Sequence, residues 1–180
     1  RFFTSNYAWK SFYGYDYLSA GPLFIHQMPH IWIDFRGIQD EYMQEKGIDY
    51  FENSRRATRI HQTYCVQNPH GYKGYSEVMW GLTATVGPGP DVCEVDGVQR
   101  EFYGYKSRGA PLGPDDGTVA PWVAVTSLPF APQIAIPTLE KILKEYPECF
   151  AEHGFKRSMN PTYPDDGQGW IANDYAAIEQ

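Results

Sequence analysis

The chain has 180 residues, of which 42% are hydrophobic and 21% are charged, a composition typical of a folded domain and unlike an intrinsically disordered one. Asp and Glu number 22 against 15 for Lys and Arg, and the resulting net charge of −7 disfavours nucleic acid as a partner. No run of about 18 apolar residues occurs, so the sequence predicts no membrane span.

The first half of the chain predicts two helices. Pro22 can begin a helix over 22–35, where apolar residues recur with a helical period, and Pro29 should kink it. Asp49 and Glu52 have the spacing of a capping box, which predicts the start of a second helix that ends before Pro69.

The second half predicts two more helices and a long loop. The segment 86–114 is too long for an ordinary connection, so it is either a functional loop or a small hairpin, with a candidate strand over 101–106. The run 118–128 is apolar on every side, as in a helix enclosed by neighbours. Residues 135–146 show a regular apolar stripe that predicts another helix.

Short apolar stretches after Ser76 and after Asn173 are typical of helix starts. Four to six helices with few alternating strands predict an all-α fold with long loops rich in Gly and Pro. No linker divides the chain. Because the sequence opens at Arg1 without methionine and closes over 176–180 in a helical pattern, we expect it to be a fragment of a larger domain.

Aromatic residues make up 16% of the chain, with 14 Tyr, 10 Phe and 5 Trp. Flat aromatic faces can stack on the C–H faces of sugar rings, and tyrosine hydroxyls can bond sugar hydroxyls. The alternative is that many of these residues simply fill the core. The three cysteines, Cys65, Cys93 and Cys149, lack the spacing of a disulfide framework or a zinc finger.

Glu77 is a candidate carboxylate within GYKGYSEVMWGLTA. The segment predicts that Glu77 lies in the first turn of a short helix, with Tyr75 and Trp80 as walls of a pocket. A helix N-terminus favours the ionised carboxylate, whereas an apolar pocket favours the protonated form. The alternative is an ordinary carboxylate at a helix N-terminus.

His26, His30 and Asp34 are spaced to form one polar stripe on a helix. Imidazoles four residues apart can share a metal ion, but Pro29 would distort the spacing and no third ligand is evident. The preferred interpretation is that Asp34 and Arg36 line a pocket as hydrogen-bonding groups, or belong to an internal polar network.

The tetrapeptide PDDG occurs at 114–117 and again at 164–167. It predicts turns, and Asp116 could cap a helix that begins near Thr118. Neither copy has the ligand spacing of a calcium loop.

Near the end of the chain, GWIANDYAAIEQ places an aromatic platform, Trp170, close to the carboxylates Asp174 and Glu179. Glycosidic cleavage needs such a pair, because one group donates a proton and the other activates water. An acidic chain also offers pairs of this kind by chance.

Four segments, AGPLFIHQMPHIWIDFRG, DYFENSRRAT with YCVQNPHGYKGYSEVMWGLTA, GPDDGTVAPWVAVTSLPFAP and GWIANDYAAIEQ, resemble the C-terminal half of the "putative glucoamylase" domain. That domain includes bacterial β-1,2-glucanases of glycoside hydrolase family 144 and related domains of cyclic β-1,2-glucan synthases. The resemblance implies part of an (α/α)6 toroid, with residues 1–180 as the C-terminal half of the catalytic domain.

The resemblance also implies hydrolysis of β-1,2-glucan with inversion, without metal or other cofactor. It assigns catalytic roles to Glu77 and Asp174. The residues expected to bind substrate are His26, Asp34, Arg36, Tyr75, Trp80, Asp115, Trp170 and Glu179. Glu179 stands where many relatives have aspartate, which keeps the charge but lengthens the side chain. IDFRG departs from the pattern of the best-studied glucanases, so the resemblance alone does not define the substrate.

Family segments of the forms D-x-x-E and G-[YW]-N-E would precede Arg1, and their glutamates are candidates for the catalytic acid. We therefore expect the chain alone to be inactive, with the N-terminal half of the same domain and a glucan as its partners. The alternatives are a non-catalytic carbohydrate-binding half-domain and a glucan-trimming domain of a synthase. Proteins of this family are commonly exported, so the resemblance implies a periplasmic or secreted location.

Overall fold

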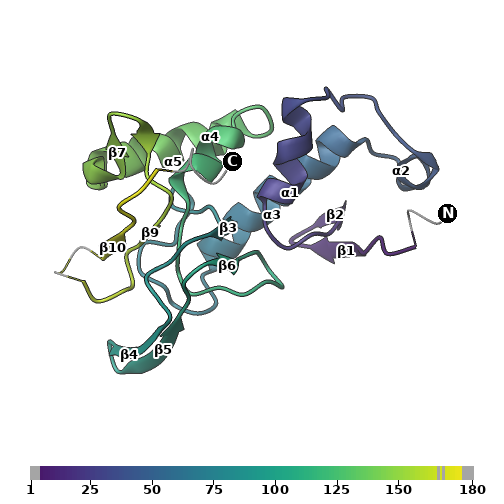
Figure 1. The fold of residues 1–180 in the computed structure, drawn as a ribbon. Helices are drawn as coiled ribbons and strands as arrows, with labels where there is room; N and C mark the ends of the chain where they lie inside the picture. Colours follow the sequence, from purple (N-terminus) through teal and green to yellow (C-terminus); the bar gives the residue numbers. More distant parts are fainter. Residues whose placement is uncertain (1–4, 166, 168, 176–180) are drawn as a thin grey trace.

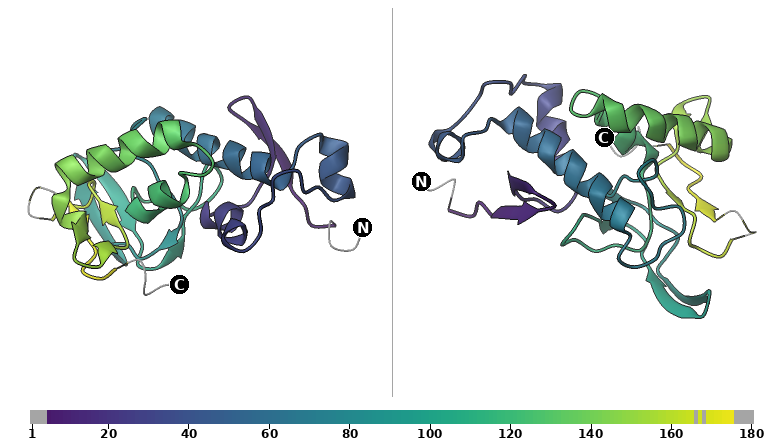
Figure 2. Two further views of the ribbon diagram at one scale, coloured as in Figure 1. Left: turned by 90° about the horizontal axis from the view of Figure 1, so that it is seen from above. Right: turned by 180° about the vertical axis from the view of Figure 1, so that it is seen from behind.

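The computed structural model describes residues 5–165, 167 and 169–175 (Figure 1). The longest helix, α3 (Tyr50–Gln67), connects the N-terminal elements to the rest of the molecule (Figure 2). The elements before it are β1 (Trp9–Phe12), β2 (Tyr15–Leu18), α1 (Phe24–Gln27), the 3-10 helix η1 (Met28–Ile31) and α2 (Glu41–Lys46).

The elements after α3 are mostly short strands, with two helices packed over one side (Figure 1). They are β3 (Ala84–Thr85), β4 (Asp91–Val95), β5 (Val98–Phe102), β6 (Lys106–Ser107), α4 (Pro121–Thr126), α5 (Pro132–Glu145), the 3-10 helix η2 (Pro147–Cys149), β7 (Phe150–Ala151), β8 (Gly154–Phe155), β9 (Met159–Asn160) and β10 (Trp170–Ile171). All pairing within these sheets is antiparallel and two-stranded: β1 with β2, β3 with β6, β4 with β5, β7 with β8, and β9 with β10.

The prediction of an all-α fold, and with it the toroid, is wrong for the part of the chain that the structure describes. Short antiparallel pairs occupy much of the sequence that was expected to be loop. The turn between β4 and β5 explains one of these pairs, because Asp96 and Gly97 both have positive φ (52° and 78°), the conformation of a tight two-residue hairpin turn. Of the two alternatives for 86–114, the structure shows the hairpin.

The helix predicted from Asp49 is confirmed as α3. The Asp49 carboxylate accepts a hydrogen bond from the Glu52 backbone N–H (2.6 Å), as an N-cap should. The Glu52 side chain instead pairs with Arg55 and Arg56, so the capping box is only half formed. At the other end, Asn68 takes a left-handed conformation (φ 44°) and ends the helix.

The helix predicted over 22–35 is shorter than expected. It comprises α1 and η1 and ends at Ile31. Pro29 lacks a backbone N–H and its ring obstructs the preceding turn, so the α-helix gives way to a 3-10 turn at this point. The helix α2 was not predicted from the sequence, although Asp40 caps its start and Gly47 (φ 70°) ends it.

The remaining predictions have mixed outcomes. The 135–146 helix is confirmed as α5, and the 118–128 helix as the shorter α4. No helix follows Ser76, which forms an isolated antiparallel bridge with Met79. The strand expected over 101–106 lies earlier, as β5. None of the helices in the described ranges has the length and apolar character needed to cross a bilayer.

The main core packs against α3. Ala57, Ile60 and Tyr64 form its buried stripe, and Trp80 and Leu82 from the following segment are fully buried against the same cluster. Because α3 contributes apolar side chains to this cluster along its length, the short strands and α4 can bury their side chains without a large sheet.

A fully buried ion pair joins Arg108 to Asp116. The Arg108 Nε and Nη2 atoms each donate to one oxygen of Asp116 at 2.7 Å, and Nη1 donates to the Thr85 carbonyl at 2.7 Å. Asp116 also accepts from the Thr118 N–H (3.1 Å), but α4 begins only at Pro121. Asp116 is therefore an internal counter-ion and not the helix cap that the sequence predicted.

Replacing Arg108 with Met should lower the free energy of unfolding by about 3 to 5 kcal/mol, because it leaves the Asp116 carboxylate buried without its partner. Urea unfolding followed by circular dichroism measures the change. The control is Lys141→Met in the exposed pair with Glu145, which should cost less than about 1 kcal/mol. Equal losses in the two variants would contradict the importance of the buried pair.

Candidate functional site

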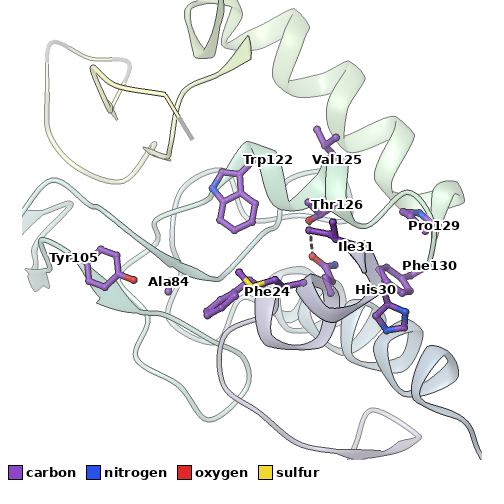
Figure 3. A pocket seen from close by; sticks show the side chains of 12 residues that line it. Phe24, His30, Ile31, Ala84, Tyr105, Trp122, Val125, Thr126, Pro129 and Phe130 are labelled. Carbon is purple, nitrogen blue, oxygen red and sulfur yellow. Dashed lines mark hydrogen bonds between the residues drawn. The ribbon is translucent and has the colours of Figure 1, made fainter. Parts of the chain in front are cut away.

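A hollow of about 300 Å³ lies between α1 and η1 on one side and α4 on the other (Figure 3). Trp122 projects from α4 toward Phe24 of α1, and Tyr105 and Ala84 close one end (Figure 3). The full lining is Phe24, Gln27, Met28, His30, Ile31, Ala84, Tyr105, Trp122, Val125, Thr126, Pro129 and Phe130. Aromatic rings therefore form much of its wall.

The two sides of the hollow are held together by Gln27, which is buried. The Thr126 hydroxyl donates to Gln27 Oε1 at 2.7 Å, the dashed line in Figure 3, and Gln27 Nε2 donates to Ser127 Oγ at 2.8 Å. Because the Gln27 amide bonds the hydroxyls of both Thr126 and Ser127, α1 and α4 are fixed relative to each other at this hollow.

The lining contains no Asp, Glu, Lys or Arg. Burial lowers the pKa of His30 below its usual value, so its imidazole is neutral at neutral pH. A hollow with aromatic walls, a few amide, hydroxyl and imidazole groups and no charge suits a neutral ligand that has both apolar faces and hydroxyl groups.

A second hollow of about 250 Å³ is also lined by residues of α1 and η1, and His30 lines both. Its lining is Tyr7, Leu18, Ala20, Ile25, His26, Pro29, His30, Phe35, Tyr50, Asn53 and Ser54. Like the first, it contains no acidic or basic side chain other than histidine.

Although His26 and His30 both line the second hollow, the structure does not arrange His26, His30 and Asp34 as a metal site. His26 is buried in α1, where Asn53 Nδ2 lies 3.4 Å from its Nδ1, whereas His30 contacts Ser54 from η1. Asp34 lies beyond η1 and is exposed. Within the described ranges, no group of three His, Cys, Asp or Glu side chains is placed to hold a metal ion.

Asp115 and Tyr75, both predicted to bind substrate, contact each other. The hydroxyls of Tyr75 and Tyr64 donate to the two oxygens of Asp115 at 2.7 and 2.9 Å. Burial raises the pKa of Asp115, and the N–H of Gly117 and these two hydroxyls oppose the shift. The hydroxyl of Tyr72 donates to the Asp115 backbone carbonyl. The cluster is satisfied internally, which gives Asp115 a structural role.

Glu77 and Trp80 lie in different surroundings. Trp80 is fully buried in the core, whereas Glu77 is exposed, and its backbone carbonyl accepts from Gln62. The expectation that Trp80 forms a pocket wall beside Glu77 is therefore wrong, because the Trp80 ring is packed within the hydrophobic core. Glu77 lies in a turn and not in the first turn of a helix.

The other predicted residues are near the surface. Asp34 and Arg36 form an exposed ion pair at 3.0 Å. Asp174, with 48% of its side chain exposed, pairs with Arg157 at 3.4 Å, and Trp170 lies on β10. Glu179 lies outside the described residues. None of Asp34, Glu77 and Asp174 lines either hollow, and their assigned roles stay predictions.

The hollow itself was not predicted from the sequence. Trp122 and Phe24 entered only as apolar positions of helices, and Tyr105 only as part of a long loop. One signal was present: a tryptophan within APWVAV, at the start of an otherwise small-residue helix, is larger than that packing needs.

A family profile described as "Putative glucoamylase" matches residues 1–180. An exo β-1,2-glucooligosaccharide sophorohydrolase of Parabacteroides distasonis is 27% identical over 164 residues, which are 90% of this chain and 19% of that protein.

Solved structures are also similar. The crystal structure of a putative glucoamylase from Bacteroides uniformis is 31% identical with a TM-score of 0.78, and the match covers 98% of this chain and 38% of that one. An endo-β-1,2-glucanase from Chitinophaga pinensis, in complex with sophorotriose and glucose, is 25% identical with a TM-score of 0.76, covering 97% and 38%. The chain thus spans well under half the length of these relatives.

Stability should fall in acid because two buried histidines are neutral in the folded state. Burial lowers the pKa of His26 to about 4 and the pKa of His61 to about 3. Neither ring nitrogen of His61 has a hydrogen bond of ordinary geometry among the described residues. The backbone carbonyls of Gly21 and Leu82 partly oppose the lowering of the His61 pKa. In the unfolded chain these histidines take up protons near pH 6.5. The stability that depends on their neutral form is therefore fully present above that pH and is lost as the pH falls toward 4.

Urea unfolding at pH 7 and pH 5 measures this loss, which can approach 1.4 kcal/mol per histidine for each pH unit. His61→Leu should reduce the difference between the two pH values, whereas His153→Leu at an exposed position should leave it unchanged. An unaltered pH dependence in His61→Leu would remove His61 as a cause.

Proposed function

Because the chain belongs to the family described as "Putative glucoamylase", which matches all 180 residues, we propose that it forms part of a glycoside hydrolase acting on β-1,2-linked glucan. The observation that carries the proposal is the set of relatives named for this linkage, a sophorohydrolase and β-1,2-glucanases. The first hollow supports it, because its aromatic and uncharged lining suits a glucosyl ring.

Sugar binding would use the hollow's rings and its few polar groups. Tyr105 and Trp122 offer flat faces to the C–H side of a glucosyl unit, and His30 and Thr126 offer groups for its hydroxyls. An anionic substrate would find no counter-charge in this lining, which favours a neutral glucan over a phosphorylated sugar.

For bond cleavage, Asp174 and Glu77 remain the proposed carboxylates. Both reach solvent, and the ion pair with Arg157 would orient Asp174. In an inverting reaction one carboxyl group protonates the leaving oxygen and the other activates water, with about 6.5 to 9.5 Å between them. Asp174 is the proposed water-activating group.

Linkage preference tests the proposal. The chain should bind sophorotriose more tightly than maltotriose in isothermal titration calorimetry, because the relatives are named for β-1,2-glucans, whereas a glucoamylase acting on starch would show the reverse. Tyr105→Ala should weaken sophorotriose binding about three- to tenfold, the range expected for one stacked ring. Tyr105 is 65% exposed, so its loss should not unfold the chain.

The matched control is Phe150→Ala, which removes another exposed ring, on β7, outside both hollows. It should leave the affinity unchanged. Equal affinity for the two trisaccharides, or no binding of either, would count against the proposed function.

Hydrolysis by the 180-residue chain alone should be undetectable in a reducing-sugar assay with β-1,2-glucan. The chain spans 38% of the Chitinophaga endo-glucanase, and the family segments with candidate acid glutamates are expected outside it. The endo-glucanase serves as the positive control. Turnover by the chain that is abolished in Asp174→Asn would show that it already contains the full catalytic set.

A further inference from the structure

We propose that Met28 is a site of reversible oxidation by peroxides, and that its oxidation weakens ligand binding in the first hollow. The chain has four methionines. Met28 is 45% exposed, whereas Met43 and Met79 are 0% exposed and Met159 is 1% exposed. Oxidation of a thioether in a folded protein follows the access of the oxidant to the sulfur. The structure therefore singles out one methionine for this reaction.

Met28 faces the first hollow because of its position in the helix. It directly follows α1, its backbone torsions are helical (φ −54°, ψ −43°), and its N–H donates to the carbonyl of Phe24. Side chains four residues apart lie on one face of a helix, and both Phe24 and Met28 line the hollow. Figure 3 shows Trp122 on the side opposite Phe24. The thioether therefore belongs to the wall against which a ligand would pack.

The reaction balances with hydrogen peroxide as the oxidant. A lone pair of the Met28 sulfur attacks one peroxide oxygen, the O–O bond breaks and an S–O bond forms. The sulfur is oxidised to the sulfoxide and the peroxide is reduced, because the proton of the transferred oxygen leaves with the other oxygen as water. Methionine sulfoxide reductases, with a thiol as reductant, return the sulfoxide to the thioether, so the change is reversible.

Oxidation makes this wall polar without giving it a charge. A thioether is apolar, whereas a sulfoxide oxygen accepts hydrogen bonds from water. The same lining includes the apolar side chains of Phe24, Ile31 and Trp122. A ligand that packs an apolar face here would displace the bound water without replacing its hydrogen bonds, which lowers affinity. This effect on binding rests on the proposed function, with a glucosyl unit as the ligand.

Cys93 carries the other sulfur that a peroxide can reach. It lies on β4, outside both hollows, and is partly exposed, whereas Cys65 and Cys149 are buried. The experiment therefore uses Cys93→Ser as its parent chain. A change in ligand binding after oxidation then cannot come from this thiol.

Peptide mapping tests the site. Cleavage after lysine and arginine places the four methionines on four different peptides, 11–36, 37–46, 74–100 and 158–180. In the folded Cys93→Ser chain, hydrogen peroxide should add oxygen to Met28 at least tenfold faster than to any other methionine. Fragment ions locate the added oxygen, because Trp32 lies on the same peptide as Met28. Equal rates at Met28 and at the buried methionines would overturn the proposal.

Calorimetry before and after oxidation tests the effect on binding. Sophorotriose binding by the Cys93→Ser chain should weaken about threefold or more when Met28 is oxidised. It should recover after treatment with methionine sulfoxide reductases and dithiothreitol. In the same background, Met28→Leu lacks the thioether, so peroxide should leave the affinity of that variant at its own untreated value.

The matched control adds Val66→Met to Met28→Leu. Val66 is 51% exposed on α3 and lies outside both hollows, so the new thioether should be oxidised with no change in sophorotriose affinity. Undiminished affinity after complete oxidation of Met28, or an equal loss in the control, would overturn the inference and leave the proposed function intact. Failure of the untreated chain to bind any β-1,2-linked glucan would instead remove the proposed function, and the effect on binding with it.

Discussion

The arrangement of the molecule depends on two adjacent carboxylates in one loop, of which Asp116 is fully buried and Asp115 is partly buried. Asp116 is neutralised by Arg108, and Asp115 is stabilised by the hydroxyls of Tyr64 and Tyr75. Burial of an uncompensated charge costs several kcal/mol, so each of these donors must stay in place. Because they come from α3, from the segment after it and from the strand β6 region, the loop fixes three parts of the chain around one point.

The buried ion pair also holds one wall of the candidate site. Arg108 Nη2 also donates to the backbone carbonyls of Tyr103 and Gly104, at 3.1 and 3.2 Å, which hold the loop immediately before Tyr105. The opposite wall is set by Gln27, which ties α1 to α4. The aromatic faces of the hollow therefore lie on segments whose backbone is fixed by buried polar contacts, the condition under which stacked rings bind a ligand with little ordering cost.

The sequence predicted features that depend on neighbouring residues and missed those that depend on distant ones. The start of α3 followed from Asp49 and its end from Asn68, since capping and termination are local. The ion pair of Arg108 with Asp116 has no local pattern. The strand β3 pairs with β6, and β9 with β10, across long intervening segments of the chain. Asp115 and Tyr75 were both selected from the sequence, but their mutual contact could come only from the fold.

The distribution of charge separates the two hollows from the carboxylates that are proposed for catalysis. Acidic residues number 22 among 180, yet neither hollow includes one, while the carboxylates proposed for catalysis lie at positions open to solvent. An anion would lack a counter-charge in either hollow, and a cation would lack a carboxylate, so both would lose hydration without compensation. A neutral polyol ring loses little by comparison, because its hydroxyls find acceptors and its C–H faces find aromatic rings. The absence of acidic and basic side chains other than histidine from both hollows thus excludes more classes of ligand than any single contact does.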